Sequence, residues 1–197
     1  AKTQVSDAET QKDNADKATT LADVQAAVDA GQTDAEKAAQ DLENAQADQK
    51  TADEQAAANL TDAQTNAKNA INADLETIQK NIDGINSDIT ELTQIAADNP
   101  DNKTIQDKLA DAQQQLTAAE TAQTAAQDAL KAVDSATTPA DVDAQEQIAT
   151  NAVTSTTGNK DQADQDLADA KGLAASDLAT DQTAAQTAVD QAISDIN

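Results

Sequence analysis

The chain has 197 residues, of which 37 are acidic and 12 are lysine, so its formal net charge is −25. A surface with this charge repels the phosphates of nucleic acids and of anionic lipids, and neither is an expected partner. The chain contains no Cys, His, Met, Trp, Tyr or Phe. Disulfides, imidazole bases, soft-metal ligands and aromatic stacking platforms are therefore absent, and most enzyme classes are excluded with them.

The apolar residues are 47 Ala and only 28 larger aliphatics, too few for a thick globular core. Low hydrophobicity with high charge is also typical of disordered chains. Here, however, the strong helix formers Ala, Gln, Glu, Lys and Leu are interrupted by only four Gly and two Pro. Because thin helical rods need little apolar surface per residue, we expect an all-α chain. No run of about 18 apolar residues predicts insertion into a membrane.

Capping signals predict six helices, over residues 2–18, 21–30, 33–97, 100–136, 139–156 and 159–196. Thr33 and Glu36 form a capping-box pattern after Gly31, and Asn99 precedes Pro100 as an N-cap would. Thr138, with Pro139 next and Asp141 three residues on, predicts another helix start. Gly158 followed by Asn159 predicts a stop and a restart. Within the long third helix, Gly84 is the expected weak point.

Apolar residues recur at spacings of three and four, which is typical of a coiled coil. The residues that form these predicted stripes are Leu75, Ile78, Ile82, Ile85, Ile89, Leu92 and Ile95, then Ile105, Leu109, Ala112, Leu116, Ala119, Gln123, Ala126, Leu130 and Val133. A weaker stripe precedes them, at Leu42, Ala45, Ala52, Ala56, Leu60, Ala63, Ala67 and Ile71. These patterns predict an elongated antiparallel helical bundle or coiled coil with spectrin-like three-helix segments.

An internal repeat is visible at the expected helix junctions. Residues 18–26 have the sequence ATTLADVQA and residues 136–144 have ATTPADVDA, with seven of nine positions identical. Gln40-Asp41-Leu42 also matches Gln165-Asp166-Leu167, at an offset of 125 residues instead of 118. The second copy is therefore seven residues longer at this point, which is one heptad. We therefore expect a partial repeat over 1–97 and a second repeat over 98–197. Because both ends fall inside repeats, the chain is expected to be about one and a half units of a longer protein.

The Thr-Thr corner within Ala-, Asp-, Gln- and Lys-rich helices resembles the Ala-rich helical repeats of cell-wall-anchored surface proteins from Gram-positive bacteria. The positions that carry the resemblance are 18–26 and 136–144, with Asp where the family more often has Glu. The resemblance implies the stalk of an adhesin, outside the cell and attached to the cell wall. The implied partners are neighbouring repeats of the same chain and, through other domains, a host surface protein or glycan.

Carboxylates are the remaining candidates for chemistry. Asp98, Asn99, Asp101 and Asn102 gather oxygen ligands at an expected hairpin tip, but they do not match a calcium-binding loop, and turn chemistry is the preferred interpretation. Four further residues predict a solvated helix face: Asp161, Asp164, Asp166 and Asp169. No Ser or Thr is paired with a base by any motif. We therefore assign no catalytic, cofactor-binding or metal-binding residue, and expect no cofactor.

The resulting expectation is a non-enzymatic stalk or spacer that holds a binding domain away from the cell wall. Two other functions stay open from the sequence. In one, a helical face is itself a binding module for a host protein or glycan. In the other, the chain is a component of a bacteriophage fibre.

Overall fold

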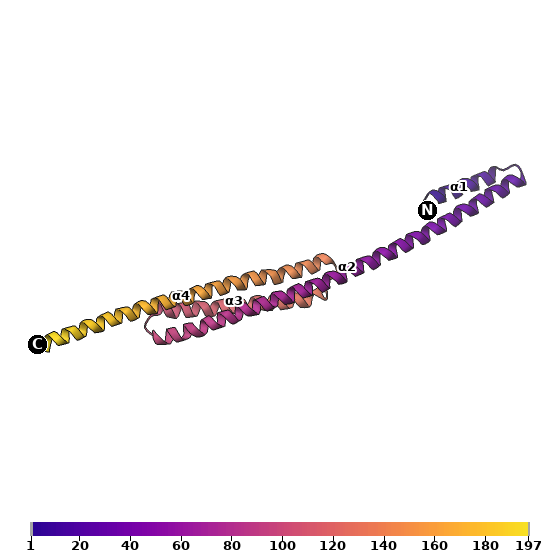
Figure 1. Cartoon of the computed structure of the whole chain (residues 1–197). Helices are drawn as coiled ribbons and strands as arrows, with labels where there is room; N and C mark the ends of the chain where they lie inside the picture. The colour runs from indigo at the N-terminus through magenta and orange to yellow at the C-terminus, as the bar shows by residue number, and fades with distance from the viewer. Residues whose placement is uncertain (1, 197) are drawn as a thin grey trace. The chain divides into compact units, whose positions relative to one another are not determined.

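The computed structural model describes residues 2–196, which form four helices and no strand. The helices are α1 (Lys2–Lys17), α2 (Leu21–Asp98), α3 (Lys103–Val133) and α4 (Pro139–Ile196) (Figure 1). The expected all-α class with packed helices is confirmed. None of the described helices carries an apolar stretch long enough to cross a bilayer.

Two of the expected helix breaks are wrong, because α2 runs through Gly31–Thr33 and α4 runs through Gly158–Asn159. Thr33 does not cap a helix: its hydroxyl donates to the carbonyl of Asp29, one turn earlier, at 3.0 Å. No glycine among the described residues has a positive φ, the conformation that a glycine helix stop requires. The cost of about 1 kcal/mol for an interior glycine is small beside the helix propensity on both sides. α2 is also continuous at Gly84.

The start of α3 also differs from the expectation. The N-cap is Asn102, whose side-chain oxygen accepts from the backbone N–H of Ile105 at 3.2 Å, so Asn99 and Pro100 lie in the preceding turn. The expected start of α4 is confirmed, with Pro139 as its first residue.

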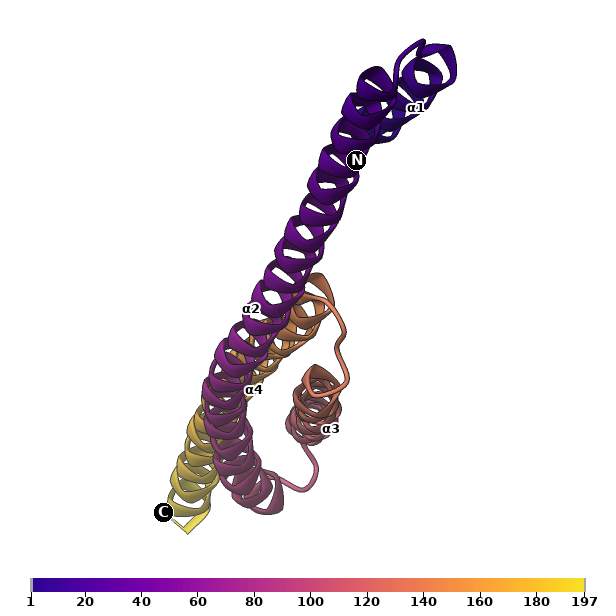
Figure 2. The ribbon, with the colours of Figure 1, turned by 90° about the vertical axis from the view of Figure 1, so that its right-hand side faces the viewer.

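The chain divides into two units, residues 1–59 and 60–197, and the division falls inside α2. The repeat boundary inferred from the sequence lies elsewhere, at 97/98, because it follows sequence similarity and not packing. In the second unit, the end of α2, α3 and the first part of α4 lie side by side as an antiparallel three-helix bundle, shown from two directions in Figures 1 and 2. Hydrogen bonds tie both ends of this bundle: Gln64 of α2 donates to the carbonyls of Val133 and Ala136 at 3.2 Å. At the other end, Asn102 donates to Asp177 of α4.

The core of the second unit is one continuous stripe of small and medium aliphatic side chains. Ile71, Ile78, Ile85 and Leu92 of α2 are fully buried within it. From α3 the stripe takes Ile105, Ala112, Ala119, Ala126 and Val133, and from α4 it takes Val142, Ala149, Ala152, Ala163, Leu167 and Ala170. The predicted stripes from Leu60 to Val133 are therefore confirmed, because every member is buried or half-buried. Polar Thr156 and Asp166 also lie inside the core, which the periodicity did not predict.

The first unit is a two-helix hairpin of α1 and the beginning of α2. Among residues 3–59, only Ala27 is buried. The hairpin is tied at its open end by Gln4, which donates to Asp41 at 2.7 Å. Beyond it the predicted weak stripe has no cover: Leu42, Ala45, Ala52 and Ala56 are all exposed, so the expectation that they are packed is wrong.

The two Thr-Thr corners have the same local structure. Asp23 and Asp141 each donate a backbone N–H to the hydroxyl of the threonine three residues earlier, Thr20 and Thr138. Each threonine hydroxyl in turn donates to the aspartate carboxylate, at 2.6 and 2.8 Å. These hydrogen bonds, from Thr138 first, lower the pKa of Asp141. The similar sequences therefore start α2 and α4 in the same way.

Candidate functional site

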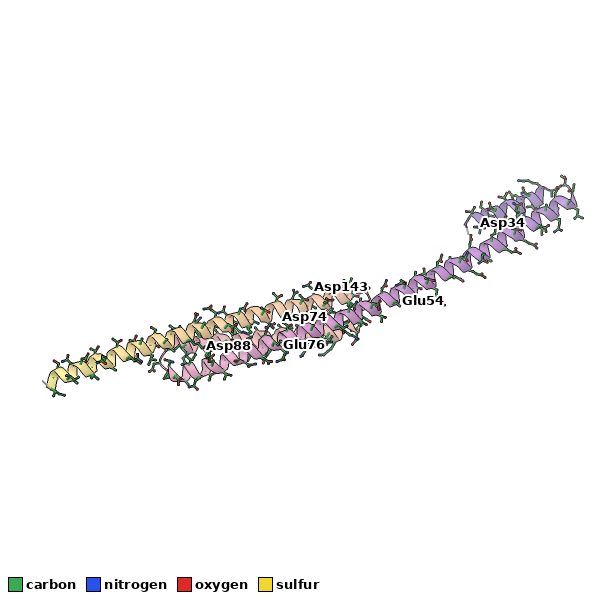
Figure 3. The ribbon with its side chains drawn as sticks, viewed as in Figure 1. Asp34, Glu54, Asp74, Glu76, Asp88 and Asp143 are labelled. Carbon is green, nitrogen blue, oxygen red and sulfur yellow. The ribbon has the colours of Figure 1, made fainter. Side chains whose placement is uncertain are left out.

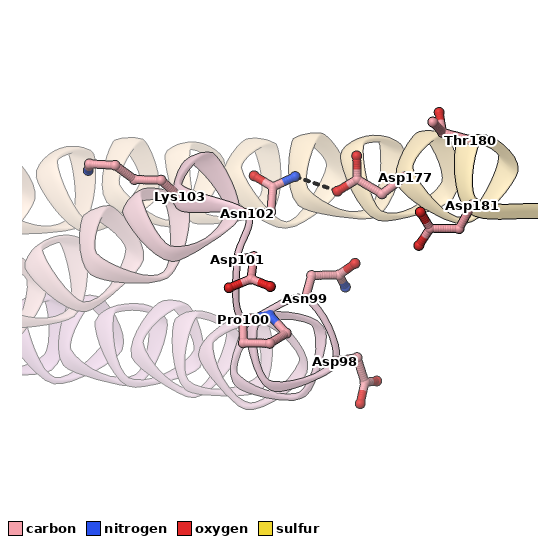
Figure 4. A pocket seen from close by; sticks show the side chains of 9 residues that line it. All are labelled: Asp98, Asn99, Pro100, Asp101, Asn102, Lys103, Asp177, Thr180 and Asp181. Carbon is pink, nitrogen blue, oxygen red and sulfur yellow. Dashed lines mark hydrogen bonds between the residues drawn. The ribbon is translucent and has the colours of Figure 1, made fainter. Parts of the chain in front are cut away.

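The candidate cation ligands lie at the tip of the second unit, where α2 turns into α3 beside α4. The turn is lined by Asp98, Asn99, Pro100, Asp101 and Asn102, and α4 adds Asp177 and Asp181 (Figure 4). The side chain of Asp98 points away from that of Asp101 in this view. The sequence therefore placed these residues at a hairpin tip correctly, but the fold does not direct their carboxylates to one point.

The amides at this tip are used by the backbone. Asn99 donates to the carbonyl of Ile95 at 2.8 Å, and Gln106 donates to the carbonyl of Ala96 at 2.9 Å, so the last turn of α2 is closed by side chains. Asn102 caps α3 through its oxygen and donates its amide hydrogen to Asp177 at 2.6 Å. Within residues 2–196, no group of three or more acidic side chains is placed to hold a metal ion. The chemistry of the tip is that of capping and turn formation.

A partly buried ion-pair cluster links α3 to α4. Lys108 lies 3.0 Å from a carboxylate oxygen of Asp166 and 2.8 Å from one of Asp169. Asp166 is only 1% exposed, and its second oxygen, Oδ2, has no hydrogen-bond partner. Hydrogen bonds to Asp169 and Asp166 raise the pKa of Lys108 to about 12, and the bond from Lys108 lowers the pKa of Asp169. The interpretation of this acidic stretch as a wholly solvated face is therefore wrong at Asp166.

A second acidic cluster joins α2 to α4. Asp88 is 9% exposed, and burial, followed by the neighbouring charge of Asp164, raises its pKa. Lys160 donates to both oxygens of Asp164, at 2.8 and 2.7 Å. The side chain of Lys160 lies over Gly84, where a Cβ atom would collide with it. Gly84 is thus a point of close approach between α2 and α4, a role that the sequence alone did not reveal.

Both clusters bring charged side chains of two helices together. Each consists of one lysine with carboxylates, Lys108 with Asp166 and Asp169 and Lys160 with Asp164 beside Asp88. The pKa of Asp88 is raised by burial, and in a helix bundle such a shift also arises from packing alone. The lysines of these clusters therefore offset the negative charge of carboxylates that lie between the helices of the bundle.

An apolar groove runs between the two helices of the first unit. It is lined by Val5, Ala8 and Lys12 from α1 and by Asp34, Ala35 and Ala38 from α2. Val5 is 55% exposed, and at the corner Val24 and Val28 are 36% and 45% exposed. Sequence reasoning missed this groove because helical periodicity shows which residues share a face, but not which neighbour covers that face.

Elsewhere the helices present acidic side chains to solvent. Glu54 and Glu76 of α2 and Asp143 of α4, labelled in Figure 3, are exposed, whereas half-buried Asp74 accepts a hydrogen bond from Thr150 of α4 at 3.3 Å. Many polar side chains bond within their own helix, such as Gln49 to Asp53 at 2.8 Å. Such surface pairs are worth about 0.2–0.5 kcal/mol each, so they contribute more to solubility than to stability.

Comparison of the chain with protein-family models, with curated proteins and with solved structures gives no match.

Proposed function

We propose that the chain is a non-enzymatic structural stalk or spacer, part of a bacterial surface adhesin that projects a binding domain away from the cell wall. The observation that carries this proposal is the form of the second unit's core. Its buried aliphatic side chains make one continuous stripe along three helices. Such a core maximises length for the number of residues used.

The dimensions of the helices agree with a spacer. At about 1.5 Å per residue, the 31 residues of α3 extend about 46 Å and the 58 residues of α4 about 87 Å. Three parallel or antiparallel helices resist bending better than one, because each side chain in the stripe is fixed by two neighbours. The bundle of the second unit is therefore a stiff segment suited to carrying load or keeping distance.

The surface chemistry also supports a location outside the cell. With no cysteine, folding of the chain is independent of the redox state around it. Its net charge of −25 keeps neighbouring copies apart at low ionic strength. We place the stalk outside the cell and attached to the wall because of these properties and the resemblance of the two Thr-Thr corners to Gram-positive surface repeats.

The proposal is tested with a surface-displayed fusion. A small ligand-binding domain is attached before the chain, a cell-wall anchor is attached after it, and residues 60–177 are either retained or deleted. A spacer predicts that deletion reduces access of large antibodies to the binding domain, while binding of a small ligand is unchanged. Equal antibody access to both forms would contradict the proposal.

The groove of the first unit favours a second candidate, a helical binding module for a host protein or glycan. The purified 197-residue chain can be assayed against immobilised extracellular proteins and glycans. A pure spacer gives no saturable binding in this assay. Saturable binding that is lost on Val5→Asp would replace the stalk proposal with the binding-module candidate.

A further inference from the structure

Equivalent residues in the two corner motifs are buried to very different degrees. Val24 and Val142 occupy the same place in ATTLADVQA and ATTPADVDA, yet Val24 is 36% exposed and Val142 is 1% exposed. The local hydrogen bonds of the two corners are alike, so the difference does not come from the corner itself. It comes from what packs on the corner.

In the second unit, α2 is the helix that covers the corner. Its Gln64 donates to the carbonyls of Val133 and Ala136, on either side of the end of α3. Its Lys68 forms an ion pair with Asp134. Further along, Gln123 of α3 donates to Gln79 of α2 at 2.7 Å. Residues 60–79 of α2 therefore lie along the hairpin that α3 and α4 form.

The last part of α4 has the sequence pattern of this covering helix. When residues 118 positions apart are compared, five larger or buried apolar residues and one glutamine of the covering segment return at the same spacing, whereas half-buried Ala63 is replaced by Asp181. The pairs are Leu60 with Leu178, Gln64 with Gln182, Ala67 with Ala185, Ile71 with Val189, Leu75 with Ile193, and Ile78 with Ile196. The offset of 118 is also that of the two corners; the match of Gln40-Asp41-Leu42 with Gln165-Asp166-Leu167 has an offset of 125, one heptad more, which leaves the same helix face toward the hairpin.

These equivalent residues again differ in burial. Ile71 and Ile78 are fully buried, whereas their equivalents Val189 and Ile196 are 53% and 85% exposed. Leu178, the equivalent of half-buried Leu60, is 59% exposed. The chain thus carries a hairpin whose groove is open and a helix with the pattern that fills such a groove.

We propose that residues 178–196 of one copy of this chain dock into the α1–α2 groove of a second copy and complete a three-helix bundle there. The contact reproduces the packing of residues 60–78 on α3 and α4. Leu178 lies near the corner of the second copy, Ile196 lies between Val5 of α1 and Ala35 of α2, and Val189 lies two helical turns closer to the corner than Ile196. This inference does not rest on the stalk proposal, which stands or falls separately.

The repeat also assigns polar contacts to the docked helix. The residues 118 positions before Val133 and Ala136 are Ala15 and Ala18. Gln182 therefore donates to the carbonyls of Ala15 and Ala18, as Gln64 does to their equivalents. The ion pair of Lys68 with Asp134 is not reproduced, because Gln186 stands where the pair has lysine. Gln186→Lys would restore it with Asp16 and strengthen docking.

The contact is head-to-tail, so a chain with one end docked still offers its other end. Such contacts produce rings or open-ended chains of more than two copies. The docked segment contains Asp181, Asp190 and Asp195 but no lysine. Because both chains carry a net charge of −25, their electrostatic repulsion opposes docking. At 0.1 M salt the repulsion between charges more than about 10 Å apart is largely screened. Association is therefore expected to strengthen as salt is added.

Sedimentation of the full chain at increasing concentration and salt tests the proposal. We expect the average mass to rise beyond that of a dimer. The dissociation constant of each contact should be about 0.1 mM, because the interface is small. The tail variant Leu178→Asp with Val189→Asp, and the groove variant Val5→Asp with Ala35→Glu, should each weaken association about a hundredfold. Leu42→Asp, an equally exposed leucine outside both surfaces, is the matched control and should have no effect.

Mixing the two variants gives the sharpest result. The tail of the groove variant can still dock on the groove of the tail variant, so the mixture is expected to form dimers and nothing larger. Circular dichroism confirms that each variant keeps its helices. A wild-type chain that stays monomeric, a mixture that forms no dimer, or a Leu42→Asp chain that loses association as the tail variant does would each overturn the proposal.

Discussion

The two corner motifs show how far local sequence determines structure. Both begin a helix with the same threonine–aspartate capping bonds, and both join two antiparallel helices. In residues 60–197 a third helix covers the corner and the hairpin becomes the base of a continuous core. In residues 1–59 the hairpin keeps its local geometry but buries only Ala27 among residues 3–59. Capping is thus a local property, whereas burial depends on a neighbour supplied by another segment.

The largest expected effect lies in the ion-pair cluster that only the second unit contains. Lys108→Met removes the cation beside Asp166, which is 1% exposed, and leaves that carboxylate buried without a counter-charge. We expect a loss of about 3 kcal/mol in the free energy of unfolding, measured by urea denaturation. The matched control is Lys103→Met, since Lys103 forms an exposed pair with Asp107 and its loss should cost less than about 0.5 kcal/mol.

The raised pKa of Lys108 adds a pH dependence to this prediction. Because the folded pKa of about 12 exceeds the ordinary value of 10.5, the stabilisation from Lys108 is complete below pH 10.5. It is lost as the pH rises through about 12. Lys108→Met should therefore flatten the alkaline part of the stability profile, and an unchanged profile would contradict the role given to this residue.

The corner valines give the most direct matched pair. Val142→Ala removes methyl groups from the core and should cost about 2 kcal/mol, whereas Val24→Ala at the equivalent exposed position should cost less than about 0.5 kcal/mol. Both are measured by urea denaturation of the full chain at low protein concentration. Equal costs would mean that the two corners are covered to the same extent.

Asp88 supplies a smaller effect with a definite sign. Burial and then the charge of Asp164 raise the pKa of Asp88, so the folded state favours its protonated form. The stability gained from this protonated carboxyl is complete below the ordinary pKa of 3.8 and is lost as the pH rises through the raised pKa. Asp88→Asn removes this penalty, and we expect a higher free energy of unfolding near pH 7 but little change at acidic pH, where Asp88 is protonated. Asp83→Asn, on the exposed face of the same helix, controls for the change in net charge.

The smallest effect tests whether α4 is continuous. A Cβ atom at Gly158 would meet nothing within 4 Å, so Gly158→Ala should raise stability by about 0.5–1 kcal/mol. At Gly84 the same change would displace Lys160, and the gain should be reduced. A destabilised Gly158→Ala chain, seen as a lower thermal midpoint, would indicate that α4 ends there after all.

Much of the fold could be predicted from the sequence, because helix periodicity and capping are both local. The stripe from Leu75 to Val133 and the threonine–aspartate corner are of this kind. Gly31 and Gly158 do not end a helix, because a glycine stop is formed where the chain takes a left-handed turn and neither residue has a positive φ. The expected N-cap at Asn99 is not formed, because the side chain of Asn99 donates back to the carbonyl of Ile95 and Asn102 caps α3 instead.

The candidate sites were harder to predict because they depend on which helices meet. Asp166 belongs to an acidic run that has the composition of a solvated surface, but it faces Lys108 across the bundle. Leu42 continues the apolar spacing of its helix but lies where no other helix covers it, 57% exposed. A single sequence shows the face of a helix, and the partner of that face is determined by tertiary packing.

Amide hydrogen exchange, followed residue by residue at low protein concentration, tests the central claim most directly. The account predicts that amides in the middle of α3, in the three-helix bundle, are protected at least about a hundredfold more strongly than those in the middle of α1, in the open hairpin. Equal protection of α1 and α3 would contradict it, because the two hairpins would then be equally covered.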